Sequence, residues 1–309
     1  MGKTLYLECN SGISGDMAVA ALLDLGADQE KLLKVIDSID ADGFEIKISR
    51  VKKSGLDCMD FDVVLDAEHD GHDHDMEYLY GHEHVEEHHH EVSSDAHNNG
   101  SAGKTGIVEH EHGHNHNHHK HRGMKEINEI LDRADMTAGT RKIVDDIFDV
   151  LARAEAKAHG VAIEDVHFHE VGAIDSIVDV VAFAVCLDDL GITEVIVPKL
   201  FDGHGTVRCQ HGILPVPVPA VSNIVSEHGI ALEILDVKGE LVTPTGAAFV
   251  AATRTAEALP KEFKIEKIGM GAGKRETGLA GFLRGMIIED VGYFGHRSLQ
   301  NKDYNSCHE

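Results

Sequence analysis

Stretches with the apolar spacing of helices and strands occupy the first 65 residues and resume at about residue 122. In the first stretch, residues 4–7 form a short apolar run and residues 17–25 have the composition of a helix. Residues 44–51 alternate apolar and polar positions, and residues 59–65 do so in part, as strands do. This order predicts a small unit of strands and helix at the N-terminus.

The second stretch predicts a larger set of elements. Apolar residues recur at helical spacing over residues 137–159, and residues 176–190 are apolar nearly all round, which is typical of a buried helix. Residues 194–198 and 282–291 have strand character, and Thr243-Pro244 begins another helix with proline at its first position. Strands that alternate with helices predict an α/β fold, with α+β as the alternative.

These patterns divide the chain into four segments. They are an N-terminal α/β unit (1–65), a His/Asp/Glu-rich insertion (66–121), a main α/β domain (122–291) and a loose tail (292–309). The insertion has no core-forming period, and its composition is typical of a disordered, solvated segment. The sequence leaves open whether the segments on its two sides share one sheet.

Histidine sets the insertion apart. The chain has 24 histidines, of which 16 lie between His69 and His121, and 24 − 16 leaves 8 for all other positions. Imidazole suits nickel, zinc and copper, and 13 acidic residues in the insertion raise the local concentration of cations. We interpret this tract as a segment that captures or stores nickel; the alternative is a solvated tract that binds metals without a role. The candidate ligands in the tract are His88, His89, His90, His112, His114, His116, His118 and His119.

Charge and cysteine content narrow the class of protein. The chain has 28 Lys+Arg against 54 Asp+Glu, a net charge of −26, which argues against nucleic acid or an anionic membrane as partner. The five cysteines are odd in number and form no CxxC pair, as expected of a reduced, cytoplasmic protein. No signal pattern begins the chain, and no stretch is long enough to span a bilayer.

The glycine-rich turn SGISGD lies between a predicted strand and a predicted helix. Backbone N–H groups at such a helix N-terminus suit a phosphate or carboxylate, so Ser14 and Gly15 are candidate ligand-binding residues. Asp16 would then bind a metal or orient the ligand. The alternative is a tight turn in which Ser14 caps the helix.

The densest group of metal-ligand types outside the tract is His167, His169, Glu170 and Asp175. If the segment is extended, His167 and His169 point the same way and Glu170 points away. Alternatively, the loop gathers His169, Glu170 and Asp175 at the start of the buried helix, where Asp175 is the predicted N-cap. The structural alternative is a cap and a core histidine.

Two further loops carry charged groups beside glycines. In FDGHGTVRCQHG, glycines flank His204 and His211, and Arg208 between them is suited to a carboxylate or phosphate. Cys209 is interpreted as a bystander, because no CxxC motif or helix N-terminus is evident beside it. In GMGAGKRE, Lys274 and Arg275 are candidates for a nucleotide phosphate.

Five motifs occur in order along the chain, and with them the chain resembles the LarC family, the nickel-insertion proteins of nickel-pincer nucleotide biosynthesis. That family also has a similar His-rich insertion between the first two motifs. The motifs are SGISGDM, HFHEVGAIDSIVDVV, GHGTVRCQHGILPVPVPA, GELVTPTGAA and GMGAGKRE.

The resemblance implies an activity. LarC proteins insert nickel into pyridinium-3,5-bisthiocarboxylic acid mononucleotide and form two Ni–S bonds and one Ni–C bond. The Ni–C bond requires loss of a ring proton, so a base is needed; His169, His204 and His211 are the candidates, with Asp16 as a further catalytic residue. A mixed site of His167, His169, Glu170 and Asp175 would release nickel more readily than a thiolate site.

The resemblance also implies cofactors and partners. The family reaction, that of a metal-inserting lyase, uses CTP with Mn²⁺ or Mg²⁺, bound by a C-terminal domain that we expect this chain to lack and to need. The expected partners are that C-terminal LarC part, the mononucleotide substrate and an apoenzyme such as lactate racemase, and we expect a homo-oligomer. The alternative function is a nickel store or metallochaperone without catalysis, as the tract by itself would suggest.

Overall fold

The computed structural model describes residues 2–39, 41–66, 122–168, 173–209 and 211–292. The expected disorder of the insertion and of the tail concerns residues that lie outside these ranges, apart from Asp66 and Gly292. Within the described part, helices and strands both contribute, and the sheet is mixed, which confirms the predicted α/β class.

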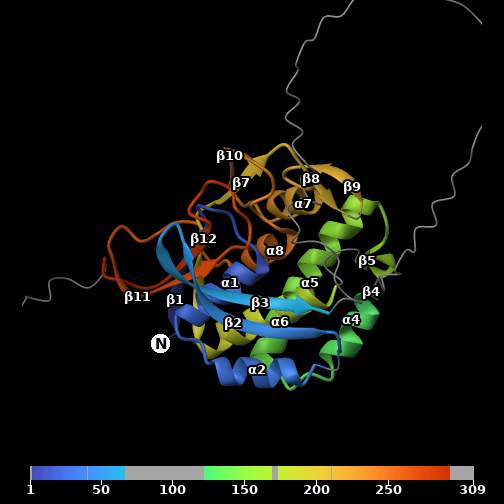
Figure 1. Cartoon of the computed structure of the whole chain (residues 1–309), viewed down its shortest axis with the longest axis horizontal. Helices are drawn as coiled ribbons and strands as arrows, with labels where there is room; N and C mark the ends of the chain where they lie inside the picture. Colours follow the sequence, from blue (N-terminus) through green and yellow to red (C-terminus); the bar gives the residue numbers. More distant parts are fainter. Residues whose placement is uncertain (1, 40, 67–121, 169–172, 210, 293–309) are drawn as a thin grey trace, which may run out of the picture.

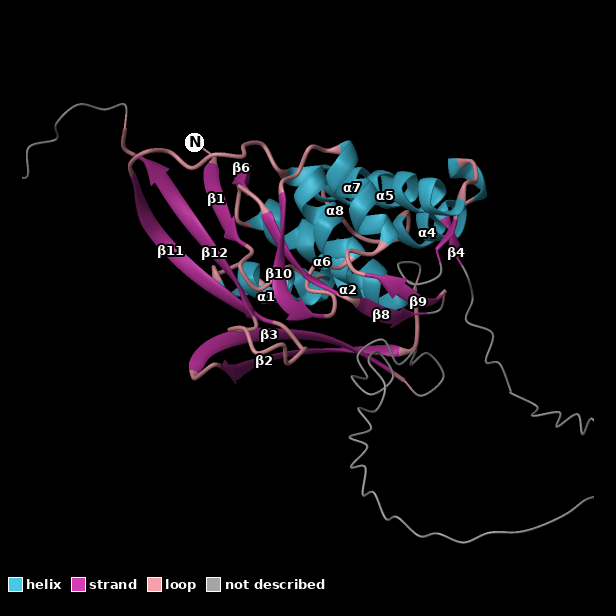
Figure 2. Ribbon diagram, turned by 90° about the horizontal axis from the view of Figure 1, so that it is seen from above, coloured by secondary structure: helices cyan, strands magenta, loops and turns pink. Residues whose placement is uncertain are grey.

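A six-stranded mixed sheet forms one side of the molecule (Figures 1 and 2). Its strands come from both sides of the His-rich insertion, so the two predicted segments share one sheet. The outer antiparallel pair β2–β3 meets β11 in parallel, and β1 pairs antiparallel with β12 and parallel with β6. In spatial order the strands are β2 (Phe44–Lys53), β3 (Leu56–Leu65), β11 (Phe263–Ala272), β12 (Phe282–Asp290), β1 (Lys3–Glu8) and β6 (Ile192–Ile196).

Helices cover one face of this sheet (Figure 2). Helix α1 packs on β3, β11, β12 and α6, and α5 packs against α6, α7 and α8. Every residue of α6 from Val180 to Leu187 is buried, as its apolar sequence predicted. The helices are α1 (Gly15–Asp24), α2 (Gln29–Asp37), α4 (Met124–Leu131), α5 (Ala138–His159), α6 (Ile174–Asp189), α7 (Pro219–Glu227) and α8 (Pro244–Thr253), with a 3₁₀ turn, η1, at Ile163–Asp165.

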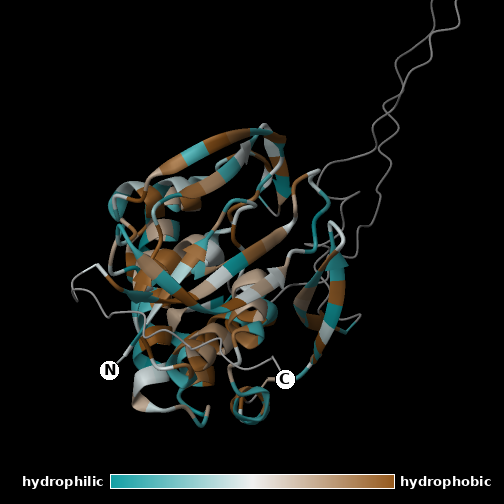
Figure 3. Cartoon of the chain, turned by 90° about the vertical axis from the view of Figure 1, so that its left-hand side faces the viewer, coloured by the Kyte–Doolittle hydropathy of each residue, from teal (hydrophilic) through white to brown (hydrophobic). Residues whose placement is uncertain are grey.

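Three two-stranded sheets complete the described part. They pair β4 (Arg122–Gly123) with β5 (His167–Phe168), β7 (Leu200–His204) with β10 (Leu232–Lys238), and β8 (Thr206–Cys209) with β9 (Gly212–Pro215). Hydrophobic residues gather in the central helices, and hydrophilic residues alternate with them along the outer strands (Figure 3).

The ends of α5 and α8 have clear capping residues. Thr137 caps α5 by accepting a hydrogen bond from the Thr140 backbone N–H at 2.9 Å, and α5 ends at Gly160, whose φ is +67°. Thr243 caps α8 and Pro244 is its first residue. The prediction of Asp175 as the N-cap of α6 was wrong: Ala173 is the cap, and Asp175 lies in the first turn, where a carboxylate complements the helix dipole.

Half of the predicted loop GMGAGKRE is strand. Gly269 and Gly271 lie within β11, where a Cβ on Gly271 would come within 2.0 Å of the Met17 carbonyl oxygen in α1. These glycines therefore allow the helix to approach the sheet closely, and only Lys274 and Arg275 remain to face a ligand.

Candidate functional site

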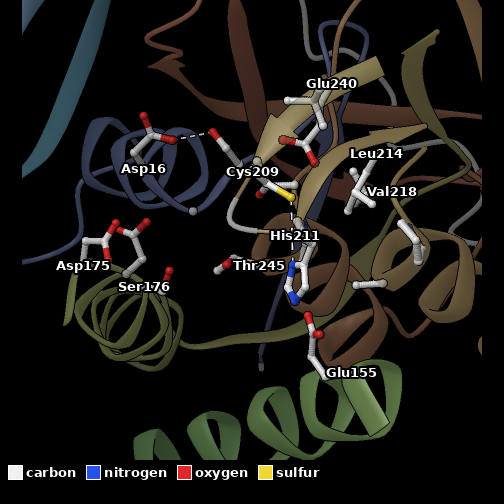
Figure 4. Close-up of a pocket in the computed structure, with 18 of the residues that line it drawn as sticks. Asp16, Glu155, Asp175, Ser176, Cys209, His211, Leu214, Val218, Glu240 and Thr245 are labelled. Atoms are coloured by element: carbon white, nitrogen blue, oxygen red, sulfur yellow. Dashed lines mark hydrogen bonds between the residues drawn. The ribbon is translucent and has the colours of Figure 1, made fainter. Parts of the chain in front are cut away.

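A cavity of about 370 Å³ lies where several helices and strands meet. The N-terminal turns of α1 and α6 form one wall, and the end of α5 with the β8–β9 hairpin forms the other (Figure 4). The turn before α8 and the segment after β11 close the remaining sides. Its lining contains six carboxylates (Asp16, Asp62, Glu155, Asp175, Asp179, Glu240) and three cations (Arg208, Lys274, Arg275).

The first wall is acidic because two helices begin there. Ser14 donates a hydrogen bond through its hydroxyl to Asp16, and Asp16 Oδ1 also accepts from the Met17 backbone N–H at 2.8 Å. Ser14 is the N-cap of α1, as the structural alternative required, but its side chain contacts Asp16 instead of a backbone N–H. Asp175 and Ser176 lie on α6 beside them (Figure 4).

Asp179 is a partly buried member of this acidic wall. One of its carboxylate oxygens, Oδ1, is buried and accepts no hydrogen bond. Burial raises the pKa of Asp179 well above its ordinary value, and the neighbouring charges of Asp16 and Asp175 raise it further. A Cβ on Gly15 would lie 2.2 Å from Asp179 Oδ2, so glycine at this position is what allows α1 and α6 to meet.

The three cations differ in how they are held. Lys274 Nζ lies 3.0 Å from Asp62 and 3.2 Å from Asp60; burial opposes its charge, but these acids and Asp16 outweigh burial and raise its pKa. Arg275 donates to the carbonyl of Glu240 at 2.7 Å and to its carboxylate at 3.0 Å.

Arg208 is the cation best placed for a ligand. It lies on β8, it is exposed, and no described residue forms an ion pair with it. Its guanidinium is therefore available for a phosphate or carboxylate in the cavity.

The opposite wall carries sulfur and imidazole groups. Cys209 Sγ lies 3.9 Å from His211 Nδ1, and the His211 ring points from Cys209 toward Glu155 (Figure 4). His159 lies beside this pair, with its ring centroid 4.9 Å from that of His211 and its Nε2 3.4 Å from Glu155 Oε2.

A buried carboxylate behind the cavity positions one of its sides. Asp202 Oδ1 accepts hydrogen bonds from the backbone N–H groups of Gly203, Leu241 and Val242, at 2.8, 2.8 and 3.2 Å. Burial raises the pKa of Asp202, although these three hydrogen bonds and Arg275 act in the opposite direction. The contacts fix the segment that carries Glu240, and therefore also the position of Arg275.

The structure gathers most of the predicted residues outside the tract. Ser14, Gly15, Asp16, Asp175, Arg208, His211, Lys274 and Arg275 all line the cavity.

Two predicted histidines do not line it. His204 Nε2 lies 3.3 Å from Asp236 Oδ1, and His167 Nδ1 lies 3.1 Å from the Asp165 carbonyl oxygen. His169, Glu170 and the tract histidines lie outside the described residues. Within the described ranges, no three His, Cys, Asp or Glu side chains already converge on a point that would hold a metal ion.

Sequence analysis did not single out Glu155, His159 or Glu240. Glu155 and His159 are one helical turn apart near the end of α5, a spacing that marks a shared face but not what that face meets. Cys209 was interpreted as a bystander, yet it lines the cavity. The position of the β8–β9 hairpin beside α5 is the missing information for Glu155, His159 and Cys209. For Glu240, the missing information is its contact with Arg275.

The fold and the site define a mixed α/β protein with an acidic cavity that carries cysteine and histidine on one wall. Residues 5–306 match the model of the family described as nickel insertion protein, and the chain belongs to that family. No solved structure matches the chain. In the described part, no helix is both long and apolar enough to cross a membrane.

Three relatives carry the name pyridinium-3,5-bisthiocarboxylic acid mononucleotide nickel insertion protein. The chain is 47% identical to that of Alkaliphilus metalliredigens, over 98% of this chain and 65% of the relative. Identity is 36% to the Acetivibrio thermocellus protein, over 91% and 59%, and 37% to the Clostridium acetobutylicum protein, over 94% and 65%. The chain thus spans about three fifths of the length of these relatives.

Proposed function

We propose that this chain inserts nickel into pyridinium-3,5-bisthiocarboxylic acid mononucleotide, as the names of its relatives state for them. In this proposal the protein is a nickel chelatase of the lyase class, with nickel as a substrate.

One observation carries the proposal: residues of all five family motifs line the same cavity. Asp16, Asp179, Arg208, Thr245 and Lys274 come from five different motifs, separated by up to 258 positions along the chain (274 − 16), and all five line it. A nickel store would need the His-rich tract but none of these motifs, so their convergence favours a reaction over storage.

The charges of the cavity fit such a substrate. Six carboxylates against three cations attract Ni²⁺ and the positively charged pyridinium ring. Arg208 is suited to the mononucleotide phosphate, because no described residue forms an ion pair with it. The N-terminal turn at Ser14 and Gly15 is a second place for the phosphate.

Formation of the Ni–C bond requires a group that accepts the ring proton. Of the predicted bases, His211 lines the cavity, whereas His204 faces Asp236. We propose that His211 accepts this proton, while Asp16 and Asp175 on the facing wall attract the ion and the positively charged ring into the cavity (Figure 4).

The His-rich tract is proposed to supply the nickel. Its flanking residues lie beside the cavity: Val63, which lines it, is three positions before Asp66. At the other end, Arg122 lies close enough to Asp175, another lining residue, to feel its charge. Burial lowers the pKa of Arg122, and the charge of Asp175 opposes that lowering. A segment attached at both ends near the cavity delivers ions to it over a short distance.

The cavity is a poor match for CTP with Mn²⁺ or Mg²⁺. Two of its three cations are already engaged by Asp60, Asp62 and Glu240, and the acids would repel a triphosphate. We therefore propose that CTP and its metal bind the C-terminal LarC part. We further propose a cytoplasmic homo-oligomer that passes its product to an apoenzyme such as lactate racemase.

Single substitutions in the cavity test the proposal. Arg208→Ala is expected to raise the KM for the mononucleotide at least tenfold, and His211→Ala to lower kcat, with the nickel-bearing product measured by mass spectrometry. His228→Ala, outside the cavity lining, is the matched control and should change neither. Unchanged kinetics in both cavity variants would contradict the proposed site.

A nickel store or metallochaperone without catalysis is the second candidate, and the tract is what favours it. A store would retain bound nickel and give no product under any condition of the same assay.

A further inference from the structure

We propose that Cys209 and His211 form a two-ligand transfer site that receives nickel on the wall of the cavity and passes it to the substrate. The role of transfer rests on the proposed function, whereas the binding site itself rests on the geometry of the hairpin.

The two donor atoms are already close enough for one ion. Cys209 Sγ and His211 Nδ1 are 3.9 Å apart across the turn of the β8–β9 hairpin. Bonds of about 2.3 Å to sulfur and about 2.1 Å to imidazole nitrogen, as zinc makes, allow donor atoms to lie up to about 4.4 Å apart. An ion can therefore contact both atoms without movement of the backbone.

Cys209 differs from the other described cysteines. Cys9, Cys58 and Cys186 are buried, and burial raises the pKa of each thiol, that of Cys9 to about 12. A thiol must lose its proton to bind a metal, so these three are poor ligands. Cys209 is partly exposed and faces the cavity.

Two protein ligands suit a site that must give its metal away. No third donor converges on this point among the described residues, so coordination positions stay open for water or for an incoming ligand. Thiolate and imidazole suit nickel better than carboxylate does, and the two thiocarboxylate sulfurs of the substrate would compete for the ion with donors of the same kind.

His159 and Glu155 support the pair from α5. The His159 ring lies against that of His211 at an interplanar angle of 45°, and its Nε2 is 3.4 Å from Glu155. Both side chains line the cavity beside the pair, so they limit the positions open to the His211 ring.

The transfer of nickel through Cys209 neither consumes nor produces protons overall. When nickel binds, Cys209 releases one proton to solvent and forms a sulfur–nickel bond. When nickel leaves for the substrate sulfurs, the sulfur–nickel bond breaks with both electrons on sulfur, and the thiolate takes up one proton from solvent. His211 loses the ion in the same step, and its imidazole can then accept the proton that the pyridinium ring releases. No oxidant or reductant is required.

A nickel titration of the full chain tests the site. In a Cys307→Ser background, which removes the tail cysteine, Ni²⁺ added under reducing conditions beyond saturation of the His-rich tract is expected to give a near-ultraviolet thiolate-to-nickel absorption band. Cys209→Ser should abolish the band, and His211→Ala should weaken it at least tenfold at equal nickel. The matched control Cys58→Ser should retain it in full.

A band that persists in Cys209→Ser, or that never forms in the Cys307→Ser chain, would overturn the proposal. Equal unfolding temperatures of the variants exclude misfolding as the cause of a loss. The titration contains no nucleotide, so a band with no nickel-bearing product in the insertion assay would contradict the proposed function and leave the binding site standing.

Discussion

Asp179 shows most clearly how single residues define the site. Its carboxylate lies between α1 and α6, where Gly15 leaves room for it and where burial and two neighbouring acids disfavour its charge. A sequence that keeps such an acid in an apolar helix loses stability at neutral pH. We infer that the carboxylate is kept for the ligand of the cavity, because a cation bound there would compensate its charge.

Asp179→Asn is therefore expected to stabilise the protein. The pKa of Asp179 is raised on folding, so the stability that its protonated form contributes is complete below the ordinary value of 3.8 and is lost as pH rises toward the raised pKa. Asparagine cannot ionise, so the variant should have the higher Tm at pH 7, with the difference shrinking toward pH 4. Thermal unfolding over this range measures it; a lower Tm at pH 7 would contradict the assignment.

For Asp202 we expect the opposite, a loss of stability when the carboxylate is removed. Its carboxylate accepts three backbone hydrogen bonds, so Asp202→Ala should leave those buried donors unsatisfied. We expect a loss of about 1–3 kcal/mol in the free energy of unfolding, measured by denaturant titration. Asp202→Asn keeps one acceptor oxygen and should lose less; an equal loss in both variants would show that charge, not hydrogen bonding, is what matters.

At the scale of elements, close contact between helix and sheet explains the glycines of β11. The glycines of residues 269–276 predict a loop that binds a phosphate. In the structure their role is different, because a Cβ at Gly269 or Gly271 would collide with the backbone of α1. The contact holds the N-terminal turn of α1, and hence Asp16, at the cavity.

Gly271→Ala should therefore move α1 away from the sheet and cost about 1–3 kcal/mol of stability, as overpacked cores do. Gly285→Ala is the matched control on the neighbouring strand β12, where the nearest atom is a methyl carbon of Leu25 at 3.0 Å. Denaturant unfolding of both variants should show a clearly larger loss for Gly271→Ala; similar losses would contradict this explanation of the glycines.

The sequence predicted elements more fully than it predicted the contacts between them. Local patterns predicted the helices α1, α5, α6 and α8 and the strands β1, β2, β3, β6 and β12, because the periodicity and end signals of these elements lie in adjacent residues. The short hairpin strands β8 and β9, the pair β7–β10 and the glycine-rich strand β11 were not predicted. They could not show that β8–β9 folds over α5, so Glu155 and His159 were missed and His204 was included. Contacts between distant segments depend on packing that no local spacing encodes.

In the whole molecule, we propose that nickel supply and the reaction belong to different parts of the chain. The described residues form the cavity, and the tract between Asp66 and Arg122 carries 16 of the 24 histidines. Replacement of residues 69–121 by a glycine–serine linker should leave product formation unchanged at saturating nickel and lower it several-fold at limiting nickel. Loss of product at saturating nickel would make the tract part of the reaction itself.

The most direct test of the central claim is a mass spectrum of the bisthiocarboxylate mononucleotide after incubation with this chain, Ni²⁺, Mn²⁺ and CTP. A parallel sample adds the C-terminal LarC part, made separately. We expect a nickel-bearing nucleotide in the supplemented sample, and a weaker signal or none without the supplement. An unchanged nucleotide in both samples, with nickel still bound to the protein, would contradict this expectation and favour a nickel store.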